Sequence, residues 1–420
     1  MRDSSSSSEM QDPAHIEVAL AGARPKAMAA LLRYFRDLDT AEEAFQEACL
    51  RALQNWPVKG PPQSPTAWLV AVARNAALDA KRRGRSNEPL PDADLTDPHD
   101  DLSADRLDAL DYPDDILRLL FVCGHPTLPA TQQIALALRI VCGLSVGQIA
   151  KAFLVTAAAM EQRITRAKRA IADIGVEFET PGTAERQTRL TAVLAMIYLM
   201  FNEGYGSTPE TAEARAPLAD EAIRLGRLLL SLFPTDPETF GLLALMLFQQ
   251  SRAPARFDTN GEIVLLEAQD RSRWDRRLID EARLLLERAA NYRNPGPYQL
   301  QAAIAALHAR AVRFDDTPWK EINSVYRVLE TLQPSPVVTL NRAVAVWKLQ
   351  GPGPALELIE PLKGALDSYF YWHGLRGTLL KVLGRSAEAR ESLTRAIALA
   401  NSMAEAQLIR RELDSLESGD

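Results

Sequence analysis

The sequence has few cysteines and lacks any long apolar run. Its three cysteines, Cys49, Cys123 and Cys142, lie in apolar surroundings without paired spacing. This argues against a disulfide-stapled scaffold and is typical of a reduced protein. No apolar stretch is long enough to span a bilayer, and the start, MRDSSSSSEMQDP, contains no hydrophobic signal segment. We therefore expect a cytoplasmic protein that does not contact a membrane.

Motifs that carry chemistry are missing as well. The sequence shows no His-rich metal spacing, no phosphate-binding loop and no nucleophile motif. Cys123 and His125 (VCGHP) could suggest a metal, but two ligands do not make a site, and a small buried residue beside a turn is the simpler interpretation. We therefore expect no enzyme activity, no cofactor and no metal.

The charge is unevenly distributed. The 420 residues are 47% apolar and 25% charged, enough for two to four domains, and the net charge is −7. Residues 88–115 carry eleven acids and one base, a net charge of −10, so the other residues sum to +3. Residues 74–87 hold five bases against one acid, and residues 139–170 hold six against one. Because the acidity is local, the overall charge does not argue against a nucleic-acid partner.

Residues 145–171 predict a helix-turn-helix with a basic second helix. Ser145 is a plausible N-cap of the first helix, and Thr156 is placed to cap the second. One face of the second helix is an apolar stripe at helical spacing, made of Met160, Ile164, Ala167 and Ile171. The opposite face carries Ala158, Gln162, Thr165 and Arg169, flanked by Arg166 and Lys168. Such a face suits a DNA major groove, although an ordinary helical hairpin with a solvated basic face is the alternative.

Three further helices are predicted near the start of the chain. The first begins near Arg24, and Thr40 is placed to cap the second. The second helix has a buried stripe of Ala41, Ala44, Phe45, Ala48, Cys49, Ala52 and Leu53. Residues 54–65 (QNWPVKGPPQSP) are rich in Pro and Gly and predict a loop, after which Ser64 and Pro65 start the third helix.

These segments resemble a known family. RDLDTAEEAFQEACLRALQNWP followed by SPTAWLVAVARNAALDAKRR closely resembles region 2 of the extracytoplasmic-function group of bacterial sigma-70-type RNA polymerase sigma factors. The helix-turn-helix, preceded by DILRLLFVCGHPTLPATQQIALALRIVCGLS, resembles their region 4. The resemblance implies an all-α protein that binds core RNA polymerase and promoter DNA, with region 2 at the minus-ten element and region 4 at the minus-thirty-five element.

The resemblance also implies roles for individual residues. An exposed face of the second helix would contact the polymerase clamp through Glu42, Glu43, Gln46 and Glu47. Asn55 and Trp56, in the predicted loop, would capture a base flipped from the minus-ten element. The third helix would lie along that element with Arg74, Asn75, Asp79, Arg82 and Arg83, while Trp68 is either core or a DNA contact. In region 4, Gln162 could read adenine and Arg163 could read guanine or hold phosphate, beside Ala158, Thr165, Arg166, Lys168 and Arg169.

The organisation that we predict has five parts. They are a disordered tail at 1–22, region 2 at 23–86, an acidic linker at 87–112, region 4 at 113–180 and a helical extension at 185–418. The linker is a solvated spacer, an RNA mimic or a cover for the basic faces; the residues leave this open. In the extension, KLQGPGPALELIEPL (348–362) aligns with VLGRSAEARESLTRAI (382–397) at a period of 34 residues, which is typical of tetratricopeptide helix pairs.

The extension is expected to be regulatory. FNEGY (201–205), in which Gly204 suits a C-cap, and QDRSRWDRRLI (269–279) resemble the extension of a sigma subgroup with tetratricopeptide-type C-terminal domains. We expect a groove in it that takes a protein or peptide partner or contacts the DNA-binding modules, while Trp274 could simply fill a core. The rival function is a ligand- or partner-sensing helix-turn-helix regulator that does not bind core polymerase.

Overall fold

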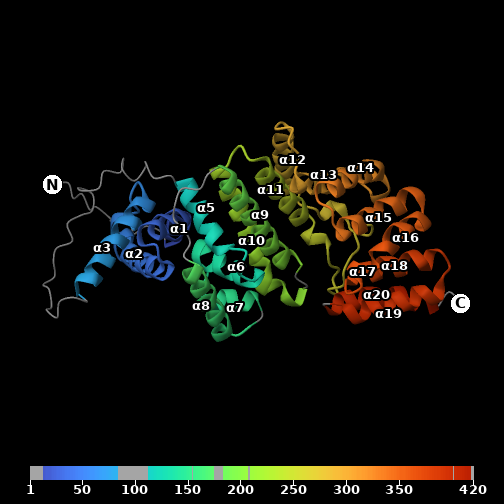
Figure 1. Ribbon diagram of the computed structural model, residues 1–420, viewed down its shortest axis with the longest axis horizontal. Coiled ribbons are helices and arrows are strands. Elements are labelled where there is room, and N and C mark those ends of the chain that lie inside the picture. The colour runs from blue at the N-terminus through green and yellow to red at the C-terminus, as the bar shows by residue number, and fades with distance from the viewer. Residues whose placement is uncertain are drawn as a thin grey trace, which may run out of the picture. The chain divides into compact units, whose positions relative to one another are not determined.

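The computed structural model describes residues 13–83, 112–153, 155–174, 183–206, 209–400 and 402–417. Over these residues the regular structure is helical, and the one β element is an isolated bridge between Phe257 and Ile263. This confirms the all-α fold. The chain divides into two compact units, Met1–Met200 and Phe201–Asp420, whose helices Figure 1 labels in order. Every helix within the described ranges is too short or too polar to cross a lipid bilayer.

The first unit begins with three helices that pack pairwise against one another. They are α1 (Pro13–Phe35), α2 (Leu38–Lys59) and α3 (Pro65–Arg83). Small residues along α2 allow this close packing, and the buried part of its predicted stripe is Ala41, Ala44, Phe45, Ala48 and Ala52. Leu53, which we expected inside, is 54% exposed, because it lies at the edge of the stripe near the end of the helix.

The ends of α1 and α2 differ from the predicted ones. Helix α1 starts at Pro13, inside the expected tail, and Ile16 is buried with 2% of its surface exposed. Asp37, not Thr40, caps α2: its carboxylate accepts a hydrogen bond from the Thr40 N–H at 2.7 Å. Helix α2 also continues through Pro57 instead of ending in a loop, because burial of Trp56 overrides the low helix propensity of proline.

The second half of the first unit contains the helix-turn-helix. Its elements are α5 (Tyr112–Cys123), α6 (Ala130–Ala137), the π-helical turn η1 (Leu138–Cys142), α7 (Val146–Ala152) and α8 (Ala157–Ile174). Ser145 and Gln148 form a capping box at the start of α7, and the Thr156 hydroxyl accepts a hydrogen bond from the Ala159 N–H at 3.2 Å. Both predicted caps are therefore confirmed. Leu154, in the predicted break, lies outside the described residues.

Helix α9 (Thr183–Tyr205) belongs to both units. Its first part packs on α5: the Arg189 guanidinium lies 4.9 Å from the centre of the Phe121 ring, and a Cβ on Gly124 would lie 3.2 Å from the Met196 sulfur. The boundary between the compact units falls after Met200, later than the boundary near 180–185 that we expected. The part of α9 before that boundary contains the buried residues Leu190, Val193, Leu194 and Ile197.

The second unit is a succession of helices. The longer ones are α10 (Pro209–Leu232), α11 (Pro237–Ser251), α12 (Arg276–Ala290), α13 (Pro297–Arg310), α14 (Trp319–Leu332), α15 (Pro336–Gln350), α16 (Pro352–Ile359), α18 (Phe370–Val382), α19 (Ser386–Leu399) and α20 (Met403–Glu417). Short turns of helix between them are η2 (Ala253–Ala255), η3 (Arg271–Arg273), η4 (Phe314–Asp316), η5 (Glu360–Leu362) and α17 (Lys363–Leu366).

The predicted 34-residue repeat corresponds to two helix pairs, α15 with α16 and α18 with α19 (Figure 1). The helices of each pair are joined at a glycine with positive φ, Gly351 at 91° and Gly384 at 73°. Ala355 and Ala389, which the repeat aligns, are both fully buried, as close approach of the paired helices requires. The two copies therefore have equivalent turns and equivalent buried positions.

Each of the two motifs of the extension makes its own contacts through arginine side chains in the second unit. The Arg256 guanidinium lies 4.0 Å from the centre of the Tyr205 ring and donates a hydrogen bond to the Tyr205 carbonyl. Arg271 donates to the carbonyls of His308 and Ala311 at 2.6 and 2.7 Å. Trp274 is buried with 3% exposure, in agreement with a core role. Gly204 is not a C-cap, because α9 runs on to Tyr205.

Helix α11 lies close to α13 at Gly241, where a Cβ would lie 2.6 Å from the Gln299 backbone nitrogen. Gly241→Ala should therefore lower the free energy of unfolding by about 1–3 kcal/mol, because a backbone cannot yield as a flexible side chain can. Gly353→Ala is the control: it lies in α16 with open space around it and should be neutral or stabilising by up to about 1 kcal/mol. Urea unfolding checks both, and equal midpoints would contradict the close approach.

Burial, with Arg252 and Arg271 nearby, lowers the pKa of His308 to about 4, so this side chain is neutral in the folded protein. The unfolded chain takes up the proton near the ordinary pKa of 6.5. Between these values the unfolded state binds more protons, and stability should fall as the pH drops from about 6.5 towards 4. In thermal melts, the melting temperature of His308→Gln should depend less on pH than that of the wild type between about pH 6.5 and 4. Equal pH dependence in the two proteins would contradict the lowered pKa of His308.

Candidate nucleic-acid interface

Helix α8 presents one polar face opposite its buried stripe. Met160, Ile164, Ala167 and Ile171 are each no more than 6% exposed, which confirms the predicted inner face. Five of the seven residues predicted to contact DNA are exposed on the other side: Ala158, Gln162, Thr165, Arg166 and Arg169; Arg163 is half-buried. The Arg166 guanidinium donates a hydrogen bond to the Gln162 amide oxygen at 3.4 Å. The face therefore offers one amide and several cations to a ligand.

Lys168 behaves differently from its neighbours on α8. Its ammonium lies 2.6 Å from the Asp39 carboxylate and 2.7 Å from the Glu42 carboxylate, both on α2, and its side chain is 15% exposed. Burial alone would lower the pKa of Lys168, but the hydrogen bonds and charges of Asp39 and Glu42 raise it above its ordinary value. Lys168 is therefore charged and already bound within the protein, which the sequence did not indicate.

A second contact joins the same two parts of the unit. Arg139, in η1, places its Nε 2.7 Å from the other oxygen of Glu42. Arg24, on α1, donates hydrogen bonds to the carbonyls of Arg139 and Ile140, both at 3.0 Å, and lies over the Phe45 ring. Sequence reasoning missed Arg24, Asp39 and Arg139, because pairing between distant segments leaves no local pattern.

The acids of α2 are divided by this contact. Glu43, Gln46 and Glu47 are exposed, as expected for a face that binds another protein. Glu42, which we expected on the same exposed face, is only 4% exposed, because Arg139 and Lys168 cover its carboxylate. The expectation for Glu42 is therefore wrong in this structure.

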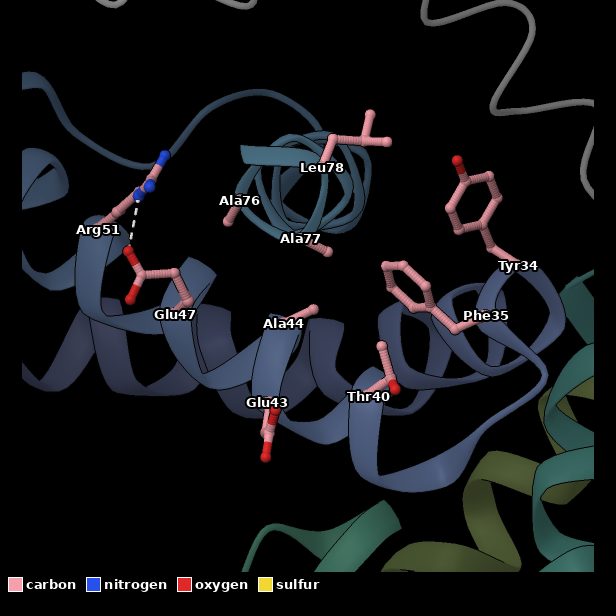
Figure 2. Close-up of a pocket in the computed structure, with 10 residues that line it drawn as sticks. All are labelled: Tyr34, Phe35, Thr40, Glu43, Ala44, Glu47, Arg51, Ala76, Ala77 and Leu78. Carbon is pink, nitrogen blue, oxygen red and sulfur yellow. Dashed lines mark hydrogen bonds and ion pairs between the residues drawn. The ribbon is translucent and has the colours of Figure 1, made fainter. Parts of the chain in front are cut away.

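A groove of about 700 Å³ runs between α2, α3 and the end of α1. In Figure 2, Phe35, Ala44 and Ala77 face one another across it, and Glu47 and Arg51 form an ion pair at 3.0 Å along its side. Glu43 points away from α3. The groove is thus apolar at its centre and charged along α2, a combination that suits a protein partner better than DNA.

The residues predicted to capture a flipped base are not in a loop. Asn55 and Trp56 lie in α2. The side-chain amide of Asn55 donates a hydrogen bond to the Arg51 carbonyl at 2.8 Å. Trp56 is 2% exposed, and its ring meets the Trp68 ring edge-on with centres 5.4 Å apart. Trp56 is therefore a core residue in this structure and cannot stack on a base, which corrects our expectation. Trp68 is half-buried, and its ring packs against the ring of Trp56.

The remaining minus-ten candidates lie on α3. Asn75 is exposed, and the Arg74 guanidinium lies over the Tyr34 ring at 4.2 Å from its centre. The side chains of Asp79, Arg82 and Arg83 lie outside the described residues, although α3 runs through all three positions. The residues that the structure describes bring together no group of three metal-ligating side chains.

Comparison with known protein families assigns both halves of the first unit. Residues 22–87 match sigma-70 region 2, and residues 119–171 match sigma-70 region 4. The chain belongs to the sigma-70-type sigma factors. Residues 189–290 of this sigma factor match a family of unknown function, DUF6596. The chain is also similar to an uncharacterized protein of Rhizobium meliloti, with 61% identity over 410 residues that span 97% of each chain.

These matches account for the geometry around α8 and α2. A sigma-70-type factor recognises promoters as a transcription initiation factor and is not an enzyme, and its two regions bind core RNA polymerase and promoter DNA. The exposed face of α8 lies in the region 4 match, and the groove beside α2 lies in the region 2 match. The family of unknown function covers both FNEGY and QDRSRWDRRLI.

The burial of Trp56 gives a test that separates a core role from a base-stacking role. Trp56→Ala should lower the free energy of unfolding by about 3–5 kcal/mol, the usual cost of removing a large aromatic side chain from a core. The neighbouring change Asn55→Ala should alter stability by less than about 1 kcal/mol, because Asn55 is exposed. Thermal unfolding followed by circular dichroism checks both, and a stable Trp56→Ala protein would contradict the core role.

Proposed function

We propose that this protein is an alternative sigma factor of the extracytoplasmic-function group whose extension regulates it. Region 2 would bind core polymerase and the minus-ten element, and region 4 would read the minus-thirty-five element. The observation that carries this proposal is the exposed face of α8, where an amide and several cations lie opposite a fully buried stripe. The order of the two sigma regions along the chain supports it.

At the minus-thirty-five element, Gln162 would read a base and the cations would hold phosphates. An amide can make two hydrogen bonds with adenine in the major groove, and Arg163 can reach guanine or phosphate. Arg166 and Arg169 are exposed on the same face and would contact phosphates. Ala158, near the start of α8, has no side-chain hydrogen bond to offer, so readout there would depend on shape or on methyl contact.

At the minus-ten element, the exposed amides are the better candidates. Asn55 and Asn75 are exposed, whereas Trp56 is inside the protein. Arg74, held over Tyr34, and the cations Arg82 and Arg83 would contact phosphates along α3. Asp79, also on α3, would then lie beside the minus-ten DNA without contributing to phosphate binding.

Core polymerase would bind the exposed side of α2. Glu43, Gln46 and Glu47 supply polar contacts there, and the apolar centre of the groove would bury the partner's side chains. An apolar centre with a charged edge is the usual composition of such an interface. The exposed Leu50 and Leu53, on the same helix, would add apolar area.

The extension would regulate through its helix pairs, which we regard as tetratricopeptide-like. The repeated turns at Gly351 and Gly384 and the buried Ala355 and Ala389 support that comparison. An apolar groove of about 460 Å³ between α11, α12, α13 and α14 is where a protein or peptide partner would bind.

Run-off transcription with purified core polymerase tests the proposal. The full chain should bind core and start transcripts at defined positions. A chain that binds DNA but neither binds core polymerase in a pull-down nor starts transcripts would instead be a ligand- or partner-sensing helix-turn-helix regulator. The sigma-70 region 2 match favours the first outcome.

Two substitutions on α8 should separate base reading from phosphate binding. Gln162→Ala should change the preference among minus-thirty-five sequences by about 1–3 kcal/mol at one base pair, because only an amide reads that position. Arg169→Ala should weaken all promoters alike and reduce the salt dependence of binding by about one phosphate. Binding of polymerase holoenzyme to a promoter library measures both. If neither change altered affinity, α8 would not be the reading helix.

A further inference from the structure

Two arginines of the second unit have no acidic partner. Arg252 is the C-cap residue of α11, and Arg256 is that of η2. Both side chains are half-buried, and no carboxylate among the residues that the structure describes lies within ion-pair distance of either one. Elsewhere in this unit a half-buried arginine has such a partner: the Arg342 guanidinium lies 2.9 Å from the Glu330 carboxylate. The positive charge of Arg252 and Arg256 is therefore left uncompensated.

The two guanidinium groups lie near each other and near the Tyr205 side chain. Arg256 lies 4.0 Å from the centre of the Tyr205 ring, and this ring stacks on the Phe201 ring with centres 5.4 Å apart. Burial lowers the pKa of Arg252; the phenolic oxygen of Tyr205 opposes this shift, and the charge of Arg256 adds to it. Two like charges are thus held together beside one phenol, an arrangement that costs free energy unless an anion joins them.

Most N–H donors of this pair are not used within the described ranges. Arg256 donates one hydrogen bond to the Tyr205 carbonyl, and Arg252 donates one to the Gln269 amide oxygen at 3.4 Å, a long and therefore weak bond. A guanidinium has further donors, arranged in a fork that matches the oxygens of a phosphate. Arg271, by contrast, binds two backbone carbonyls at 2.6 and 2.7 Å. Arg271 therefore has a structural role, whereas Arg252 and Arg256 have donors left for a ligand.

A buried tryptophan adjoins the pair. Trp274 is 3% exposed, and its indole N–H has no hydrogen-bond partner among the described residues. The Arg252 guanidinium lies 5.5 Å from the centre of the Trp274 ring. An indole N–H is only a donor, and a buried donor without an acceptor is costly. The surroundings of Arg252 therefore contain guanidinium, phenol and indole donors, but no anionic acceptor from the described part of the chain.

We propose that Arg252, Arg256 and Tyr205 form a binding site for the phosphate group of a small molecule. A phosphate dianion supplies the negative charge that the two guanidinium groups lack, and its oxygens accept several N–H donors at once. Half-buried arginines beside a buried tryptophan suit a small ligand better than a nucleic-acid backbone, which needs an open surface along several phosphates. The site belongs to the extension and does not depend on binding of polymerase or promoter DNA.

The first test measures the melting temperature of the full chain. Inorganic phosphate at about 10 mM should raise it by about 2–5 °C over chloride of equal ionic strength and pH, because a ligand of the folded state stabilises that state. Phosphate also stabilises proteins in general, so variants are compared. Arg252→Gln and Arg256→Gln should lose the rise, whereas Arg273→Gln, which removes an exposed arginine and the same charge, should keep it. Equal rises in all four proteins would overturn the proposal.

The second test leaves both arginines unchanged. The chain has six tryptophans, and isotope labelling of tryptophan gives one indole N–H signal from each in a nuclear magnetic resonance spectrum. Trp274→Phe identifies the signal of Trp274. Titration of the unaltered chain with inorganic phosphate should shift this signal until it saturates, while the signals of Trp56 and Trp68, in region 2, stay in place. A shift of every signal in proportion to the phosphate concentration, or no shift, would overturn the proposal.

Two further probes separate the sources of the anion. Acetate at equal ionic strength should shift the Trp274 signal less than phosphate, because a carboxylate brings only one negative charge; an equal shift would overturn the assignment to phosphate. A single-stranded oligonucleotide that shifts the signal where inorganic phosphate does not would overturn the assignment to a small molecule. None of these measurements contains polymerase, so failure of this site and failure of run-off transcription are distinguishable.

Discussion

The first unit depends on one buried carboxylate. The Glu42 carboxylate is buried, where an unpaired charge would be costly, and the structure supplies two cationic partners, Arg139 from η1 and Lys168 from α8. Because these come from two elements of region 4, pairing one side chain of α2 helps to position that region, together with the hydrogen bonds from Arg24 on α1 to the η1 carbonyls. The groove beside α3 and the outer face of α8 are left exposed by the same arrangement.

Much of the fold could be predicted because its determinants are local. The caps at Ser145 and Thr156 and the stripe from Met160 to Ile171 depend on residues three or four positions apart, and all three appear as expected. The repeat in the extension is also local, since equivalent turns and buried alanines recur along the chain. The exposed polar face of α8 follows directly from its stripe.

The predictions that failed depend on distant residues. Trp56 stands beside Pro57 in a segment rich in Pro and Gly, which favours a loop, but packing against Trp68 keeps it in a helix. Glu42 is indistinguishable from Glu43 in sequence, and only the approach of Arg139 and Lys168 buries one of them. A charge pattern shows which residues can pair, but the tertiary fold decides which of them do.

The position of α9 restricts where this chain can be cut into two separate parts. A regulatory module appended to a finished factor would leave the older part intact when it is removed. Here the family of unknown function begins at residue 189, whereas the first unit extends to Met200. Leu190, Val193, Leu194 and Ile197 are buried in that shared stretch, so a stop codon before it would leave apolar surface without its cover. A division of the chain that keeps the packing of the first unit therefore has to fall after Met200, within α9 or beyond it.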